Sequence, residues 1–297
     1  MGAGISAALV ALAFGVAGCG EDTDEVGGDT PTVEVLESGS EPRQELVLDV
    51  EPGDEATTTL TFDFSTSGTL DGSPLPEQDV PVYSIDFTTT VDEVTDEEIT
   101  SSFAYDEVRV ERAGADPAVV EQLESQLGAL QGTGGTLTQA PSGAVIEGTV
   151  DQPEGLDPVL ESLLSQTNEQ LKSVTVPFPE EPVGVGAQWQ SDTSFEIGGV
   201  TTNQAATYSL AELDGDRYAL EVEIEQTVVP GEIEGGGSII DSDTAGGGRL
   251  EGSLSSLSPV QSSVSTSGTV TSEVPASDGA TQELVQEIEV EVTLESG

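Results

Sequence analysis

Apolar and polar residues alternate along most of this chain with the two-residue period that predicts half-buried β-strands. The alternation is clearest in residues 58–65, 82–91 and 287–294, where apolar side chains occupy one face and Thr, Asp or Glu the other. Similar patterns predict further strands at residues 99–110, 143–150, 207–213, 218–229, 249–257 and 263–274. Within residues 99–110 the alternation changes phase, which indicates a β-bulge.

Runs of Gly, Asp and Pro separate these predicted strands. Asp71-Gly72-Ser73-Pro74 predicts a turn, and Asp214-Gly215-Asp216 predicts the turn of a hairpin. Two glycine runs, at residues 235–237 and 246–248, predict flexible loops. Residues 175–189 contain three prolines and two glycines. We therefore expect a connection without regular structure there, which leads into a strand at Trp189.

Two stretches have the three- to four-residue period of amphipathic helices. Asp116-Pro117 and Asp157-Pro158 each place a capping acid before a proline at the first helical position, where a backbone N–H is not needed. The apolar stripe of the first helix consists of Val120, Leu123, Leu127 and Leu130. That of the second, interrupted at Thr167, consists of Leu160, Leu163, Leu164, Leu171 and Val174.

The order of these elements predicts an α+β fold. We expect a strongly curved antiparallel β half-barrel with the two amphipathic helices packed on its concave, apolar face. Residues 46–297 form this single domain, because roughly 250 residues suffice for one sheet with a covered face.

The N-terminal residues predict a membrane anchor. Residues 5–16 are uncharged and mostly apolar, long enough for a secretory signal and too short to cross a bilayer. They lead to Val16-Ala17-Gly18-Cys19, in which small residues precede the only cysteine. This pattern looks like the lipobox of a bacterial lipoprotein, so we expect residues 1–18 to be removed and Cys19 to carry a lipid on the outer side of the cell membrane. The alternative is a buried apolar segment with an incidental cysteine.

The residues after Cys19 and the charge of the chain bear on its partners. Residues 19–45 are polar and acidic and predict a disordered tether. The chain has 57 acidic and 6 basic residues, a formal net charge of −51. Nucleic acid is therefore a poor partner, and the self-repulsion requires screening by salt or bound cations. This excess of acidic over basic residues is typical of a salt-adapted extracytoplasmic protein and, equally, of an ordinary acidic secreted domain.

Two resemblances follow from these patterns. The lipobox, the polar tether, the strands and the two proline-capped helices resemble the LolA-like half-barrel of bacterial lipoprotein carriers and of mycobacterial lipid-binding lipoproteins. The segment PFPEEPVGVGAQW, which ends at Trp189, and the hairpin YSLAELDGDRY from Tyr208 to Tyr218 are similar to uncharacterised actinobacterial lipoproteins of a domain-of-unknown-function family. Both resemblances imply the lipidated Cys19, and neither implies a catalytic or ligand-binding residue.

The residue types exclude several classes of enzyme. The chain has no histidine, so Ser-His-Asp triads and imidazole metal sites are absent. Lys172 lacks a serine three residues before it, where Glu169 stands instead. The glycines of Gly132-Thr133-Gly134-Gly135 follow a predicted helix rather than open one, as a phosphate-binding loop would require. We therefore expect no cofactor, no metal centre and no catalytic residue.

Acidic motifs leave other chemistries open. Asp243-Thr244-Ala245-Gly246 partly resembles the catalytic loop of an aspartic protease, and Asp241 with Asp243 could contribute to a Ca²⁺ site. A plain loop with solvated carboxylates is the favoured interpretation of both. A pair of glycosidase carboxylates can be neither excluded nor located among 57 acidic residues.

The predicted function is a non-enzymatic, membrane-anchored lipoprotein that binds a hydrophobic ligand, such as a lipid chain, between helices and sheet. The candidate cavity-lining residues are Val120, Leu123, Leu127, Leu160, Leu164 and Trp189. The competing interpretation is that these side chains simply fill the core. The alternative function is an acidic structural or interaction module that binds cations or a partner protein.

Overall fold

The computed structural model describes residues 32–75, 78–112, 116–151, 175–197, 200–233, 237–276 and 280–297. These residues form one antiparallel sheet of 15 strands. The strands are β1 (Thr32–Ser38), β2 (Glu55–Leu70), β3 (Ser73–Pro74), β4 (Gln78–Asp79), β5 (Tyr83–Val94), β6 (Ile99–Val110), β7 (Gly134–Gln139), β8 (Val145–Val150), β9 (Ala187–Ile197), β10 (Val200–Asp214), β11 (Arg217–Val228), β12 (Gly231–Glu232), β13 (Ser238–Ser253), β14 (Gln261–Pro275) and β15 (Thr281–Ser296). The helical elements are α1 (Pro117–Leu127) and the 3₁₀ helix Gly128–Leu130.

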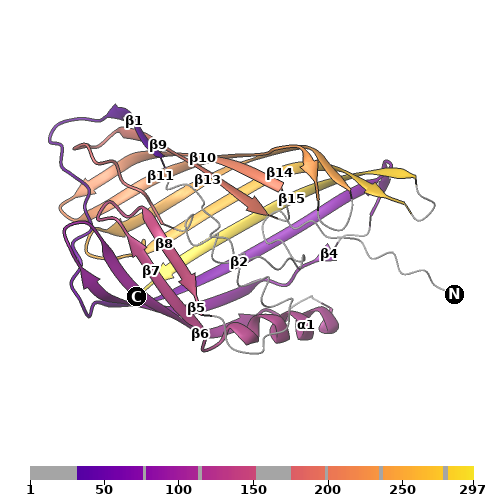
Figure 1. Ribbon diagram of the computed structural model, residues 1–297, viewed down its shortest axis with the longest axis horizontal. Helices are drawn as coiled ribbons and strands as arrows, with labels where there is room; N and C mark the ends of the chain where they lie inside the picture. Colours follow the sequence, from indigo (N-terminus) through magenta and orange to yellow (C-terminus); the bar gives the residue numbers. More distant parts are fainter. Residues whose placement is uncertain are drawn as a thin grey trace.

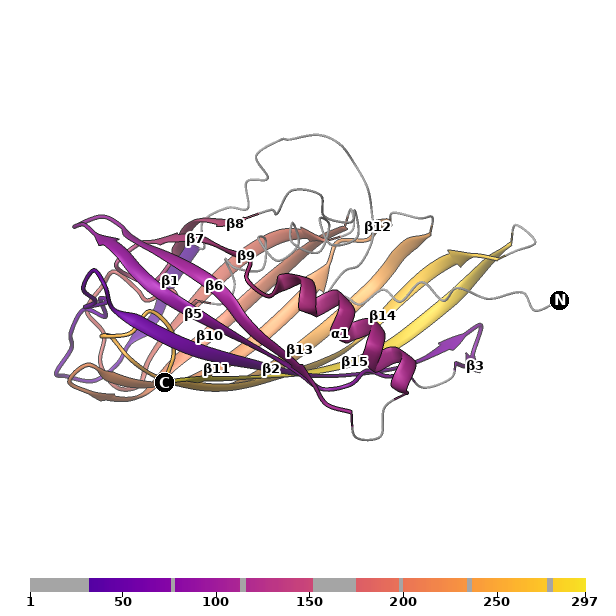
Figure 2. The ribbon, with the colours of Figure 1, turned by 90° about the horizontal axis from the view of Figure 1, so that it is seen from below.

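The main path through the sheet runs β1-β9-β10-β11-β13-β14-β15-β2-β5-β6-β7-β8. The short strands β3 and β4 pair with β2, and β12 pairs with β13. The long strands β10, β11, β13, β14, β15 and β2 form the back of a trough in Figure 1, and β5 to β8 bend forward over one end of it. Figure 2 shows the trough from below, with the sheet open between its end strands β1 and β8.

The expected α+β fold with two amphipathic helices is wrong, because the described residues form an almost entirely antiparallel β structure with one short α-helix. The second predicted helix, residues 158–174, lies outside the described residues. The first helix is confirmed as α1, and the backbone N–H of Ala118 donates a hydrogen bond of 2.8 Å to Oδ1 of the capping residue Asp116. Its Leu123 and Leu127 pack in one cluster with Phe103 and Tyr105 of β6, at one side of the trough.

The predicted flexible loop at residues 246–248 is also wrong, since these glycines lie in the middle of β13. Gly248 pairs with Val222 on one neighbouring strand and with Val264 on the other, and shares their concave-side position. A Cβ atom at Gly248 would collide with the backbone oxygen of Ser263 in β14. Glycine inside a strand thus permits the close approach of backbones that strong sheet curvature needs. A glycine run alone does not distinguish such a bend from a loop.

The bulge predicted within residues 99–110 is confirmed. The register of β5 and β6 shifts at Asp106, because Asp86 pairs with Glu107 whereas Phe87 pairs with Tyr105. The extra residue moves the inward face from odd to even positions, so Tyr105 before the bulge and Val108 after it both join the same apolar cluster.

The predicted tether is shorter than residues 19–45. Residues 32–38 form β1, which pairs with β9 at the edge of the sheet. Gln44 then forms an isolated bridge with Val183. The segment of the tether before residue 32 lies outside the described residues. Backbone pairing explains why these polar residues are ordered. A polar edge strand can be held by backbone hydrogen bonds to a neighbouring strand without burying much of its own surface.

Residues 46–50 and 176–183 fill one end of the trough, and we name them the end plug. Leu46, Phe178 and Val183 of this plug are all at most 2% exposed. Backbone hydrogen bonds of 2.9 Å from Leu48 to Pro141 and of 2.6 Å from Asp49 to Leu254 tie residues 46–50 to turns on both sides of the trough. The plug gives the curved sheet a packed core at this end.

Trp189 is the centre of that core. It is fully buried, and its indole N–H donates a hydrogen bond of 3.0 Å to the carbonyl oxygen of Pro177 in the plug. Its ring stacks on Tyr208 with centroids 5.6 Å apart. Phe178 meets Tyr218 edge to face at 5.2 Å. The proline-rich connection is therefore shaped by its contact with this aromatic cluster.

Ser and Thr flank part of the acidic row on the outer face of β15, although Glu291 lies opposite Asp63 of β2. Glu287 and Glu289 of β15 point outward, and both of their neighbouring strands place Ser or Thr opposite them. Ser65 donates a hydrogen bond of 3.3 Å to Glu289, and Ser67 one of 3.1 Å to Glu287. Because like charges directly opposite each other are destabilising, the Ser and Thr residues opposite Glu287 and Glu289 keep other carboxylates away from these two.

Replacement of Gly248 tests the curvature. We expect Gly248→Ala to lower the free energy of unfolding by about 1–3 kcal/mol, because the added Cβ collides with the backbone of β14. Gly128→Ala is the control, since a Cβ at Gly128 meets no atom within 4 Å. Denaturant unfolding followed by circular dichroism measures both. Equal stability of the two variants would contradict the close approach at Gly248.

Replacement of Ser267, an exposed residue opposite Glu289, tests the spacing of charges. We expect Ser267→Glu to be less stable than Ser267→Gln by about 0.5 kcal/mol at low salt, because it places two carboxylates side by side. The difference should shrink in about 1 M salt, where the screening length is about 3 Å. Thermal unfolding of both variants at two salt concentrations measures it. A difference that does not change with salt would argue against repulsion as its cause.

Candidate functional site

The candidate site lies on the concave face of the sheet, next to the end plug. The pairing register of the strands determines which residues form one wall of this site. Phe87 of β5 pairs with Tyr105 of β6, and Thr89 of β5 pairs with Phe103 of β6. Ser101 of β6 pairs with Leu137 of β7. These side chains share one face because successive residues of a strand point to opposite sides. The alternating pattern of β5 and β6 therefore builds a continuous apolar wall.

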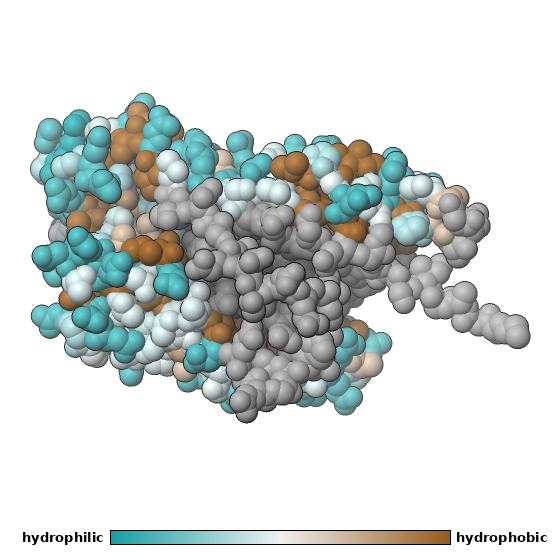
Figure 3. All heavy atoms as spheres, in the orientation of Figure 1, coloured by the Kyte–Doolittle hydropathy of each residue, from teal (hydrophilic) through white to brown (hydrophobic). Residues whose placement is uncertain are grey.

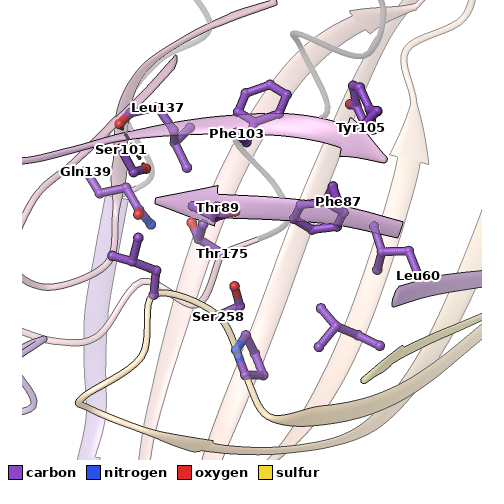
Figure 4. A pocket seen from close by; sticks show the side chains of 13 residues that line it. Leu60, Phe87, Thr89, Ser101, Phe103, Tyr105, Leu137, Gln139, Thr175 and Ser258 are labelled. Carbon is purple, nitrogen blue, oxygen red and sulfur yellow. Dashed lines mark hydrogen bonds between the residues drawn. The ribbon is translucent and has the colours of Figure 1, made fainter. Parts of the chain in front are cut away.

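The wall encloses a cavity of about 100 Å³. Residues from the turn after β13 and from the connection before the plug form the opposite side of the cavity (Figure 4). The lining residues are Leu60, Phe87, Thr89, Ser101, Phe103, Tyr105, Leu137, Gln139, Thr175, Leu257, Ser258, Pro259 and Leu294. An apolar cavity of roughly 150 Å³ can hold a benzene molecule, so this pocket has room for the end of an apolar ligand.

Among the described residues that line the pocket, none has a charged side chain, although the protein has a net charge of −51. The one titratable group of these described residues is the Tyr105 phenol, and burial raises its pKa to about 12. The phenol therefore stays neutral at physiological pH. Figure 3, in the orientation of Figure 1, shows mainly hydrophilic residues at the end of the molecule that bears the C-terminus, with a few apolar residues among them.

Gln139 is the most deeply buried polar side chain of the wall besides Ser101, with 1% of its surface exposed. Its Nε2 donates a hydrogen bond of 3.3 Å to the carbonyl oxygen of Gly143, which fixes the orientation of the amide because a carbonyl only accepts. Its Oε1 has no hydrogen-bond partner within the part of the chain that the structure describes. The Ser101 hydroxyl donates to the carbonyl oxygen of Leu137 at 3.4 Å.

The residues that the sequence suggested for a cavity lie elsewhere. Val120, Leu123 and Leu127 belong to α1, where Leu123 and Leu127 pack against Phe103 and Tyr105 and so support the pocket without lining it. Trp189 is buried in the core beside the end plug. Leu160 and Leu164, like Cys19, lie outside the described residues.

Some of the residues that line the pocket could be predicted from the sequence to point inward, and others could not. Phe87 and Tyr105 lie on apolar faces of predicted strands, so the pattern indicated that they point inward. Gln139 had no such signal, because a glutamine in a strand ordinarily occupies the solvent-facing side. Gln139 shares the inward face of β7 with Leu137, two residues before it, and the turn at Gly143, φ 83°, places a carbonyl within hydrogen-bond distance of its amide.

The acidic motifs do not form a catalytic cleft. Asp241 and Asp243 are exposed and lie in β13 rather than in a loop. Hydrogen bonds from Arg109 hold the pKa of Asp86 below its usual value, the opposite of what a general acid requires. Across the described ranges, no group of three or more Asp, Glu, Cys or His side chains is placed to hold a metal ion.

Comparisons with known proteins assign no family to this chain. No family model matches it, and no curated protein matches it significantly. The two resemblances noted from the sequence therefore stay predictions. Among the described residues, no helix has both the length and the apolar character needed to span a membrane.

Proposed function

We propose that this protein is a non-enzymatic binding protein that holds a hydrophobic small molecule on the concave face of its sheet. The observation that supports this proposal is the uncharged, mainly apolar pocket in a chain whose outward surface is acidic. Specific small-molecule sites combine apolar walls with a few placed polar groups, and Gln139 and Ser101 are such groups here. A ligand that buries about 150 Å² of apolar surface gains roughly 4 kcal/mol before the cost of ordering it.

We further propose that a lipid on Cys19 anchors the protein to the outer side of the cell membrane. The support is the sequence of small residues before this cysteine, after an uncharged apolar run. Because β1 begins at Thr32, residues 20–31 remain as the tether, and they can span roughly 40 Å when fully extended. The anchor would thus keep the pocket close to a membrane, where apolar ligands are concentrated.

The outer face favours a second candidate function, the binding of cations or of a basic partner protein. Glu221, Glu223 and Glu225 of β11 are all exposed, as are Glu287 and Glu289 of β15. Such rows attract positive charge over a long range at low salt. This function uses the opposite face from the pocket, so a change inside the pocket should leave it unaltered.

Replacement of Leu137 tests the ligand-binding proposal. The neutral probe is 4-fluorotoluene, and binding is followed by the line width and shift of its ¹⁹F NMR signal. We expect the wild-type protein to bind it and Leu137→Phe to bind it at least about tenfold more weakly, because the larger ring fills part of the cavity. Leu137→Met, which conserves volume, should bind normally. Equal binding by all three proteins, or none by the wild type, would refute the pocket as a binding site.

Replacement of Cys19 tests the anchor. We expect Cys19→Ser to move the protein from the membrane fraction to the soluble fraction when the full chain is expressed in a bacterial host that processes lipoproteins, because serine cannot form the thioether to lipid. Mass spectrometry of the wild-type protein should show a lipid-modified N-terminal cysteine. Cys19→Ser protein that stays in the membrane fraction would count against lipidation.

A further inference from the structure

The pocket presents two features that together restrict its ligand. The first is the absence of any Asp, Glu, Lys or Arg among the lining residues that the structure describes. The second is the Oε1 atom of Gln139, a buried acceptor that no hydrogen bond satisfies in the described part of the chain. A buried polar group left unpaired costs about 1–3 kcal/mol, so a ligand that supplies a donor removes a penalty of the empty site.

We propose that the pocket binds an uncharged apolar molecule carrying a hydroxyl group, and that this hydroxyl donates a hydrogen bond to Oε1 of Gln139. This inference rests on the proposed ligand-binding function and specifies its chemistry. The apolar body of the ligand packs against Phe87, Phe103 and Leu137. Aliphatic alcohols, sterols and partial glycerides belong to this class, whereas fatty acids and phospholipids do not.

Anionic ligands are disfavoured by the absence of a counter-charge. A carboxylate placed in the pocket would lose its hydration without gaining an Arg or Lys partner from the described lining residues, and a buried unpaired charge is strongly unfavourable. The net charge of −51 adds a long-range repulsion. A cation would be attracted by that field but would find no carboxylate in the lining to replace its water.

The position of Gln139 makes the acceptor available. The amide is fixed by its donor bond to Gly143, so Oε1 cannot exchange places with Nε2 without breaking that bond. In Figure 4 the amide end of Gln139 lies among the lining side chains, near Ser101 and Thr175. Thr89, Thr175 and Ser258 are only partly buried, so their hydroxyls can pair with water. Gln139 is 1% exposed, and its buried Oε1 has no hydrogen-bond partner among the described residues.

Three fluorinated probes separate the features of the ligand, and the first two are nearly the same size. They are 4-fluorotoluene, which has no donor, 4-fluorophenol, which has one hydroxyl, and 4-fluorobenzoate, which is charged. ¹⁹F NMR titration of the purified full chain gives each Kd. We expect 4-fluorophenol to bind about tenfold more tightly than 4-fluorotoluene, and 4-fluorobenzoate at least about tenfold more weakly than either.

Two matched variants assign the donor preference to one atom. Gln139→Leu removes the acceptor at similar volume, and we expect it to abolish the tenfold preference for 4-fluorophenol. Gln286→Leu is the control, because Gln286 also has a buried Oε1 without a partner among the described residues and is not one of the residues that line the pocket. It should keep the wild-type ratio. Circular dichroism confirms the fold of each variant, and the wild-type ratio tests the proposal independently should Gln139→Leu fail to fold.

The outcomes distinguish this inference from the proposed function. If 4-fluorotoluene and 4-fluorophenol bind the wild-type protein equally, the pocket is a site for apolar ligands and the hydroxyl preference is refuted. A buried water that pairs with Gln139 would give this result. A ratio of Kd values that is unchanged in Gln139→Leu also refutes it. If no probe binds at all, the ligand-binding function itself fails.

Discussion

The architecture depends on the need to bury one face of a single large sheet while the other face carries a large excess of negative charge. In β15, Ile288 and Leu294 point to the buried side, whereas Glu287 and Glu289 point to solvent. An antiparallel sheet can segregate its residues in this way because successive side chains alternate between faces. Burial of the apolar face requires the sheet to bend over itself, and the glycines of β13 and the bulge in β6 permit that bend.

Closure of the trough differs along its length, and this difference creates the pocket. At one end the irregular segments of the end plug supply the packing that a second layer would otherwise supply, with Trp189 at their centre. At the neighbouring part of β5, β6 and β7 the wall meets the turn after β13, and the cavity remains between them. The pocket is thus a consequence of curvature and incomplete filling. Its neutral lining follows from the strand alternation that sends the carboxylates outward.

Particular elements show why prediction from the sequence succeeded for strands and failed for the fold class. The strand at residues 287–294 and the hairpin turn at Gly215 were found because their signals are local: alternation of side chains, and a glycine with positive φ, here 66°. The capping acid Asp116 was found for the same reason. The glycines at residues 246–248 were misread because their role depends on a neighbouring strand. Residues 32–38 were misread because an edge strand is stabilised by backbone pairing with β9, which leaves little trace in its own side chains.

The sequence by itself determined which face of each strand is apolar, where α1 begins and that the outer surface is strongly acidic, because these properties arise from residues close together in the chain. Only the tertiary structure decided that the apolar faces meet around the end plug and that Trp189 fills a core rather than lines a cavity. It also decided that Gln139 lies buried in the pocket wall with Phe103 and Leu137, and that its Oε1 has no partner in the described part of the chain. These relations join residues far apart in sequence, and they depend on the curvature and register of the whole sheet, which no local pattern encodes.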